Sequence, residues 1–240
     1  MILANVRERL RPADFQLAVD LLAGSSDADR RYYADLLANE GPDGLLDQPG
    51  LLERLREKPG FATPSAPLFF YVAARHTLRE SGMDDARLAD YLGALLLEFG
   101  QRDRAYRIAR HGDEIRRYLV EIVADIDTAD GRREFLLYAH LGNFSLWISG
   151  IFPDYITTQN VRNGGPNFRY YDELGTRGYR LAADHGLARE LDLNEIYALA
   201  ADRFARIRVA LNRLSDRMFF PNFSSPDRLM RQVEEEFRLQ

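Results

Sequence analysis

The chain has 240 residues, 46% of them hydrophobic and 29% charged, a composition typical of a folded globular protein rather than of a disordered one. Its formal net charge of −5 at pH 7 argues against a broadly basic protein with a nucleic acid as its partner. Because the chain contains no cysteine, disulfides, cysteine-ligated metals and thiol nucleophiles are excluded.

Arginine supplies nearly all of the positive charge, since Lys58 is the only lysine among 32 basic residues. Guanidinium groups suit the recognition of phosphate and carboxylate. Codon usage in a GC-rich genome produces the same excess, and the abundant alanine, leucine, aspartate and glycine favour that explanation.

Two stretches bear on location. The opening residues MILANVRERLRPADF hold no apolar signal core, because Arg7, Arg9 and Arg11 interrupt it early. The run from Phe135 to Phe152 approaches the length of a membrane span, but its histidine, asparagine and serines make insertion costly. We therefore expect a cytoplasmic protein with a buried helix in this run and no membrane partner.

Apolar residues recur at intervals of three and four along most of the chain, which predicts an all-α fold. In the first half, Gly- and Pro-rich connections are expected at 41–50 and 59–66. The expected helical segments of this half are 13–23, 28–39, a short amphipathic piece at 51–58, 66–81 and 84–99, the last capped by Asp84.

In the second half, the stretch ITTQNVRNGGPNF at 156–168 is predicted to be a surface loop that could cover a ligand. The expected helices here are 113–127, 132–152, 167–186, 194–219 and a last one that begins after Pro226. We predict about eight to ten helices in a single compact bundle around a buried central helix near 132–152. The whole chain, 1–240, is expected to form one domain, with 1–60 as a possible N-terminal helical subdomain.

The central helix carries the main candidate site. On a helix of 3.6 residues per turn, one face of the segment holds Arg133, Leu136, His140, Asn143 and Trp147. In a structural interpretation, neighbouring helices satisfy the buried His140 and Asn143, and Gly142 and Gly150 let a helix approach closely. A lone histidine among apolar neighbours is more often such a core residue, which favours this interpretation.

In a functional interpretation, the same face opens onto a cavity and supplies an imidazole, an amide and a cation to a ligand. Tyrosine hydroxyls would suit either the buried partners or a pocket for a flat ligand with polar edges. Six of the twelve tyrosines lie at 138, 155, 170, 171, 179 and 197. The candidate ligand-binding residues are Arg133, Tyr138, His140, Asn143, Trp147 and Tyr171.

Two motifs resemble known enzyme sites. DDARLAD, with Asp84, Asp85 and Asp90, resembles the aspartate-rich Mg²⁺ site of helical prenyl-transferring enzymes, but its place at a helix start favours capping. REFLLYAH fits the Arg-to-His spacing of HEPN ribonucleases. That resemblance implies that Arg133 stabilises phosphate charge and His140 moves a proton, although Glu134 departs from the family pattern.

The histidines at 76, 111, 140 and 185 form no metal-ligand spacing, and no nucleotide-binding glycine motif occurs, so we expect no metal and no cofactor. Without a coherent catalytic set, the sequence favours a helical binding or regulatory module that recognises a protein partner or a second copy of itself. Two alternatives stay open: a small-molecule pocket or enzyme centred on His140, Asn143 and Trp147, and a metal-independent ribonuclease that uses Arg133 and His140.

Overall fold

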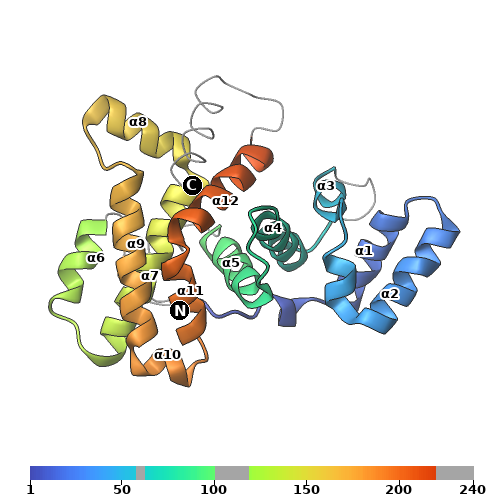
Figure 1. Cartoon of the computed structure of the whole chain (residues 1–240), viewed down its shortest axis with the longest axis horizontal. Coiled ribbons are helices and arrows are strands. Elements are labelled where there is room, and N and C mark those ends of the chain that lie inside the picture. The colour runs from blue at the N-terminus through green and yellow to red at the C-terminus, as the bar shows by residue number, and fades with distance from the viewer. Residues whose placement is uncertain (58–62, 101–118, 220–240) are drawn as a thin grey trace. The chain divides into compact units, whose positions relative to one another are not determined.

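The computed structural model describes residues 1–57, 63–100 and 119–219 (Figure 1). Within these ranges every regular element is helical and no strand occurs, which confirms the predicted all-α fold. The described part holds 12 α-helices, more than the eight to ten expected, because one predicted loop is helical, one predicted long helix is divided, and a short helix at Gly186–Glu190 was not predicted. The helix expected after Pro226 and the start of the one expected at 113–127 lie outside the described residues.

Contacts within the chain form two units. The N-terminal unit is Ala4–Leu97, and the C-terminal unit comprises Met1–Leu3 and Glu98–Gln240. The expectation of one domain over residues 1–240, with 1–60 as a possible N-terminal subdomain, stays a prediction.

The N-terminal unit begins with a 3₁₀ turn, Arg7–Arg9. Its α-helices are α1 (Pro12–Ala23), α2 (Asp27–Leu46), α3 (Leu51–Arg56), α4 (Ala66–Glu80) and α5 (Ala86–Phe99), whose last two residues belong to the C-terminal unit. The connection expected at 41–50 is partly helical: Gly41, with φ of +75°, kinks α2, and a short further turn follows. Ser65 caps α4 by accepting a hydrogen bond from the Leu68 amide at 3.2 Å.

The three aspartates of the DDARLAD motif all have structural roles. Asp85, rather than the expected Asp84, caps α5 by accepting a hydrogen bond from the Leu88 amide at 2.8 Å. Asp84 instead lies 2.6 Å from the guanidinium of Arg75, and the buried Asp90 accepts a hydrogen bond from the Arg7 amide at 2.7 Å. These contacts support the capping interpretation of the motif.

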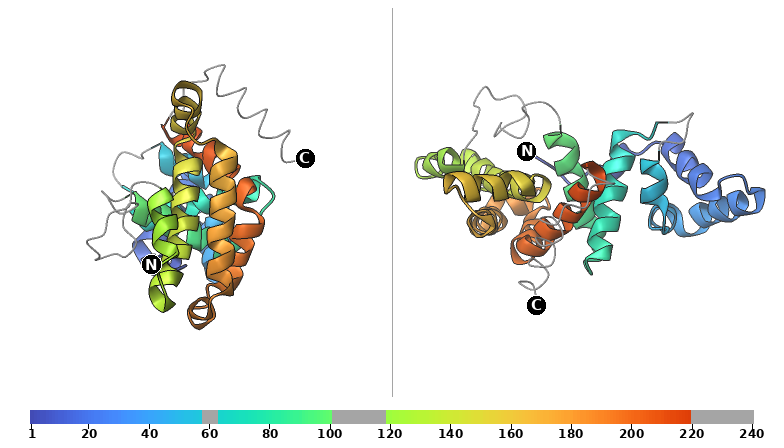
Figure 2. Two further views of the ribbon diagram at one scale, coloured as in Figure 1. Left: turned by 90° about the vertical axis from the view of Figure 1, so that its left-hand side faces the viewer. Right: turned by 90° about the horizontal axis from the view of Figure 1, so that it is seen from above.

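The C-terminal unit consists of helices packed around one long, largely buried helix, α7. Its helices are α6 (Leu119–Ile126), α7 (Gly131–Ile151), α8 (Pro153–Asn163), α9 (Phe168–Asp184), α10 (Gly186–Glu190), α11 (Asn194–Asp202) and α12 (Phe204–Phe219). Figure 2 shows α7 and α9 side by side, and α6 and α12 also pack on α7.

The prediction of a loop at 156–168 is wrong over most of its length, because the residues up to Asn163 belong to α8. Pro153 starts this helix, a position that its fixed φ favours, and Gly164, at φ of +62°, ends it. Only Pro153 and Ile156 of α8 are buried. The apolar periodicity that reveals a helix in the sequence is therefore nearly absent.

The single helix predicted at 194–219 is also wrong, since it breaks at Arg203 into α11 and α12. The apolar stripe runs through the break, so periodicity did not reveal it. After the break, the Phe204 ring fills the space above Gly175, where a Cβ would lie 2.1 Å from it.

Glycines bring α7 and α9 into close contact. A Cβ at Gly142 would lie 2.6 Å from the Tyr179 ring, and one at Gly178 would lie 2.6 Å from the Gly142 amide nitrogen. On another side of α7, a Cβ at Gly150 would lie 3.0 Å from Leu211 of α12. The expectation that Gly142 and Gly150 allow close helix approach is confirmed.

Side chains of α12 hold the carboxyl end of α7. The Asn212 amide donates hydrogen bonds to the carbonyls of Ser149 at 2.7 Å and Gly150 at 2.8 Å, and the Ser215 hydroxyl donates to the Ile151 carbonyl at 2.7 Å. The last carbonyls of a helix have no partner within the helix itself. These bonds stabilise the corner at which α8 turns away from α7 by 87°.

Candidate functional site

His140 and Asn143 lie in the interior of the C-terminal unit. The His140 side chain, from a residue only 4% exposed, lies between the rings of Phe99 and Phe144, with centroid distances of 5.9 and 6.0 Å. Asn143 is 3% exposed, and its Oδ1 accepts a hydrogen bond from the Tyr179 hydroxyl at 2.8 Å. This geometry fits the structural interpretation, in which neighbouring helices enclose the polar groups.

The other candidates on α7 do not join His140 in one site. Trp147 is partly exposed and packs edge-to-face against Phe99 and Phe152 at 5.9 and 5.5 Å. Tyr138 donates a hydrogen bond to Glu134, one turn earlier on the same helix. Arg133 is exposed whereas His140 is buried, so these two side chains do not meet at one accessible surface, as the HEPN arrangement would require.

Tyr171, the remaining candidate, lines a cavity of about 520 Å³ in the C-terminal unit. We call this space the aromatic cavity. It lies between α6, α7, α8 and α9, and its volume is within the range of small-molecule sites. Its lining residues are Leu119, Val120, Phe144, Ile148, Phe152, Tyr155, Gln159, Gly165, Pro166, Tyr170 and Tyr171.

The walls of the aromatic cavity follow helix periodicity. Phe144 and Ile148 are four residues apart on α7 and therefore share a face, and Phe152 follows four residues later at the corner with α8. Tyr155 and Gln159 have the same spacing on α8. The corner thus presents two helices to the same space.

The edge of the cavity between α8 and α9 is fastened by hydrogen bonds. The Asn160 amide donates to the Gly165 carbonyl at 2.7 Å, and the Gly165 amide donates to the Gln159 carbonyl at 3.1 Å. A Cβ at Gly165 would lie 3.2 Å from that same carbonyl oxygen, so the loop lies close against α8. Gly165 and Pro166 therefore form a firm edge.

Among the residues that the structure describes, those that line the cavity carry no charged side chain. Burial, reinforced by the neighbouring Tyr155 and Tyr170, raises the pKa of the Tyr171 phenol to about 12, so it stays protonated at neutral pH. The Tyr170 and Tyr171 rings are perpendicular, with centroids 5.5 Å apart. The described lining therefore brings tyrosine hydroxyls and aromatic rings to one space.

Sequence reasoning reached only part of this site. Tyr155, Tyr170 and Tyr171 were all recognised as members of a tyrosine group, but only Tyr171 was chosen. Phe144, Ile148 and Phe152 were missed, although their spacing of four is visible in the sequence. The same spacing is typical of any core helix, so it does not separate a cavity wall from a packed interior.

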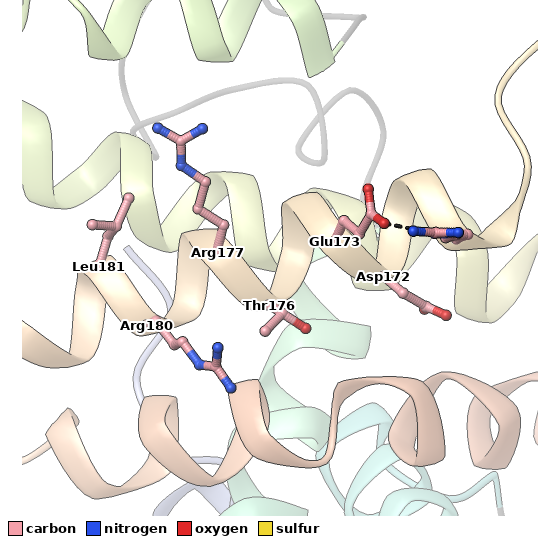
Figure 3. Close-up of a pocket in the computed structure, with 7 residues that line it drawn as sticks. Asp172, Glu173, Thr176, Arg177, Arg180 and Leu181 are labelled. Atoms are coloured by element: carbon pink, nitrogen blue, oxygen red, sulfur yellow. Dashed lines mark hydrogen bonds and ion pairs between the residues drawn. The ribbon is translucent and has the colours of Figure 1, made fainter. Parts of the chain in front are cut away.

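A second depression, of about 570 Å³, lies on the exposed face of α9 and includes Arg169, Arg177 and Arg180. Arg169 pairs with Glu173 at 2.7 Å, and Arg180 lies 3.6 Å from Asp202. Figure 3 shows Arg177 and Arg180 leaving α9 in different directions. The arginines therefore do not converge on one anion.

A third depression, of about 1060 Å³, belongs to the N-terminal unit and is rich in carboxylates. Burial works to raise the pKa of its Asp47, but hydrogen bonds from Arg75 at 2.7 and 2.8 Å outweigh burial and hold that pKa below its usual value. His76 is bonded to the Leu46 carbonyl at 2.8 Å. Within the described residues, no three potential metal ligands come together.

Comparisons of the chain with protein-family models, curated proteins and solved structures give no match in any of the three. Among the described helices, none is by itself both long and apolar enough to cross a membrane, and α7 and α8 reach that length and composition only together, as a bent pair. The functional argument therefore rests on the chemistry of the aromatic cavity.

Proposed function

We propose that the protein binds a small, uncharged and mainly apolar molecule in the aromatic cavity. The observation that carries this proposal is a volume of about 520 Å³ whose described lining is mainly aromatic and aliphatic, with Gln159 as its polar residue besides the tyrosines and no charged side chain. An ion would lose its hydration there without gaining a partner charge, whereas an apolar ring would exchange water for aromatic contacts. The small-molecule pocket that we propose differs from the one predicted from the sequence: it does not include His140, Asn143 or Trp147, but it does include Tyr171.

The chain's only tryptophan is well placed to report binding. Trp147 contacts Phe152 at 5.5 Å between ring centroids, and Phe152 lines the cavity. N-phenyl-1-naphthylamine is a neutral aromatic probe that fluoresces in apolar surroundings and accepts excitation energy from tryptophan. We expect saturable probe fluorescence on excitation of Trp147, and the absence of saturation would contradict the proposal.

A pair of matched variants locates the bound probe. Tyr155 lines the cavity and is 51% exposed, whereas Tyr32 lies in the N-terminal unit, far from this lining in the chain, and is 57% exposed. Tyr155→Ala should weaken probe binding about two- to tenfold through loss of an aromatic contact, and Tyr32→Ala should leave it unchanged. Equal effects of the two substitutions would show that the probe binds elsewhere.

The sequence-based expectation of a regulatory or self-associating module in the cytoplasm stays a prediction. Exposed apolar side chains at Val120, Phe152 and Tyr155 around the cavity favour a partner surface there, with a second copy as the simplest partner. Light scattering on the probe-binding samples shows whether a second copy of the chain covers the cavity. If it does, the protein will dimerise and its affinity for the probe will depend on protein concentration.

A further inference from the structure

We propose that the aromatic cavity selects molecules that carry a carbonyl or another uncharged hydrogen-bond acceptor, which Tyr171, Tyr155 and Tyr170 bind through their hydroxyls. The inference rests on the proposed function, since it assigns the chemical class of the molecule that the same cavity binds.

The three hydroxyls are available to a ligand. None of them forms a hydrogen bond with another residue in the part of the chain that the structure describes, in contrast to the Tyr179 hydroxyl, which bonds to Asn143. Tyr171 and Tyr170 are only partly accessible to solvent. When a ligand displaces water and forms a hydrogen bond with a half-buried hydroxyl that has no protein partner, this bond stabilises the complex.

The hydroxyls act as donors. A phenol whose pKa lies near 12 holds its proton at every physiological pH, so Tyr171 offers an O–H group to the cavity. Within the described part of the chain, no lysine, arginine or histidine lines the cavity to attract an anion, and no carboxylate lines it to attract a cation. A phenol can also accept a hydrogen bond, but its O–H group is the stronger partner, so a neutral acceptor is the complement that we assign to these groups.

The donors also stand close together. The rings of Tyr170 and Tyr171 on α9 are 5.5 Å apart between centroids, and Tyr155 of α8 lines the same cavity. Phe144 and Ile148 of α7 supply apolar wall. The arrangement suits a ligand with an apolar body and a polar group at one end.

Two ligands that differ only in the acceptor test the inference. 2-Acetylnaphthalene carries a carbonyl, and 2-ethylnaphthalene has a similar shape without one. Both are measured by displacement of N-phenyl-1-naphthylamine from the full chain. We expect Tyr171→Phe to weaken the ketone about three- to tenfold, the usual contribution of one hydrogen bond, and to leave the hydrocarbon within about twofold.

The triple variant Tyr155→Phe, Tyr170→Phe, Tyr171→Phe removes every phenolic donor while it keeps the rings, so one tyrosine cannot replace another. Loss of the ketone's advantage in this variant supports the inference, and an unchanged advantage overturns it. Retained probe binding with no difference between the two ligands would reject the acceptor preference alone. Absence of probe binding in the unmodified protein would reject the proposed function itself.

Discussion

Two parts of α7 carry similar mixtures of aromatic and polar groups but differ in what surrounds them. Around His140 and Asn143, rings from other segments close the space, and the Tyr179 hydroxyl meets the Asn143 side chain. One turn further on, Phe144 and Ile148 face the aromatic cavity, where tyrosine hydroxyls have no partner among the described residues. The comparison shows that unfilled space, rather than residue type, distinguishes a candidate site from a core.

We expect the largest loss of stability when a side chain is enlarged in the closely packed region between α7 and α9. Gly178→Ala would place a Cβ 2.6 Å from the backbone of α7, which cannot move without separating the two helices. We expect a loss of about 2 to 3 kcal/mol in the free energy of unfolding, measured by urea denaturation.

Gly186→Ala is the matched control for this substitution. A Cβ at Gly186, at the start of α10, would meet no atom within 4 Å. The variant should be as stable as the original protein or slightly more stable, because alanine favours the helix. A similar loss in both variants would mean that close packing between α7 and α9 is not the cause.

His140→Ala tests the two regions against each other. Removal of the ring leaves a space between Phe99 and Phe144, and we expect a loss of about 2 kcal/mol in the free energy of unfolding. Affinity for N-phenyl-1-naphthylamine should change less than it does in Tyr155→Ala, since His140 does not line the aromatic cavity and reaches it only through Phe144. If the variant is as stable as the original protein but binds the probe differently, the result would support a binding site at His140 instead of the aromatic cavity.

The smallest expected effect concerns alkaline stability. The pKa of Tyr171 is raised from 10.0 to about 12, so its contribution to stability is complete below pH 10 and is lost as the pH rises toward 12. Tyr171→Phe should therefore lose less stability between pH 10 and pH 12 than the original protein. Part of the loss will persist, because burial also raises the pKa of Tyr71 to about 12. Identical stability profiles in urea would contradict a desolvated phenol at position 171.

The sequence revealed helices best where many side chains are buried. The apolar stripe predicted α5 and α7 within a few residues, whereas α8 buries only two side chains and left no stripe to recognise. The cap of α5 was displaced by one residue, because adjacent aspartates are equally good caps and only the position of Arg75 assigns Asp84 to an ion pair.

The candidate site was predictable only in outline. Helix geometry correctly aligned His140, Asn143 and Trp147, but alignment on one helix does not show what the facing helices place opposite them. Tyr179 closes that face over Asn143, while Tyr171, on the same helix two turns earlier, borders open space. The difference depends on where α8 and α9 lie, which no spacing within α7 contains.

The hydrogen bonds that Asn212 and Ser215 donate to the last carbonyls of α7 link the corner beside the cavity to a segment more than sixty positions later in the chain. Contacts of such long range form late, since a large loop must close before they contribute. We therefore expect the wall at Phe152 to acquire its final orientation only after the chain has been extended beyond residue 215 during synthesis. Binding competence should accordingly be among the last properties that the folding chain gains.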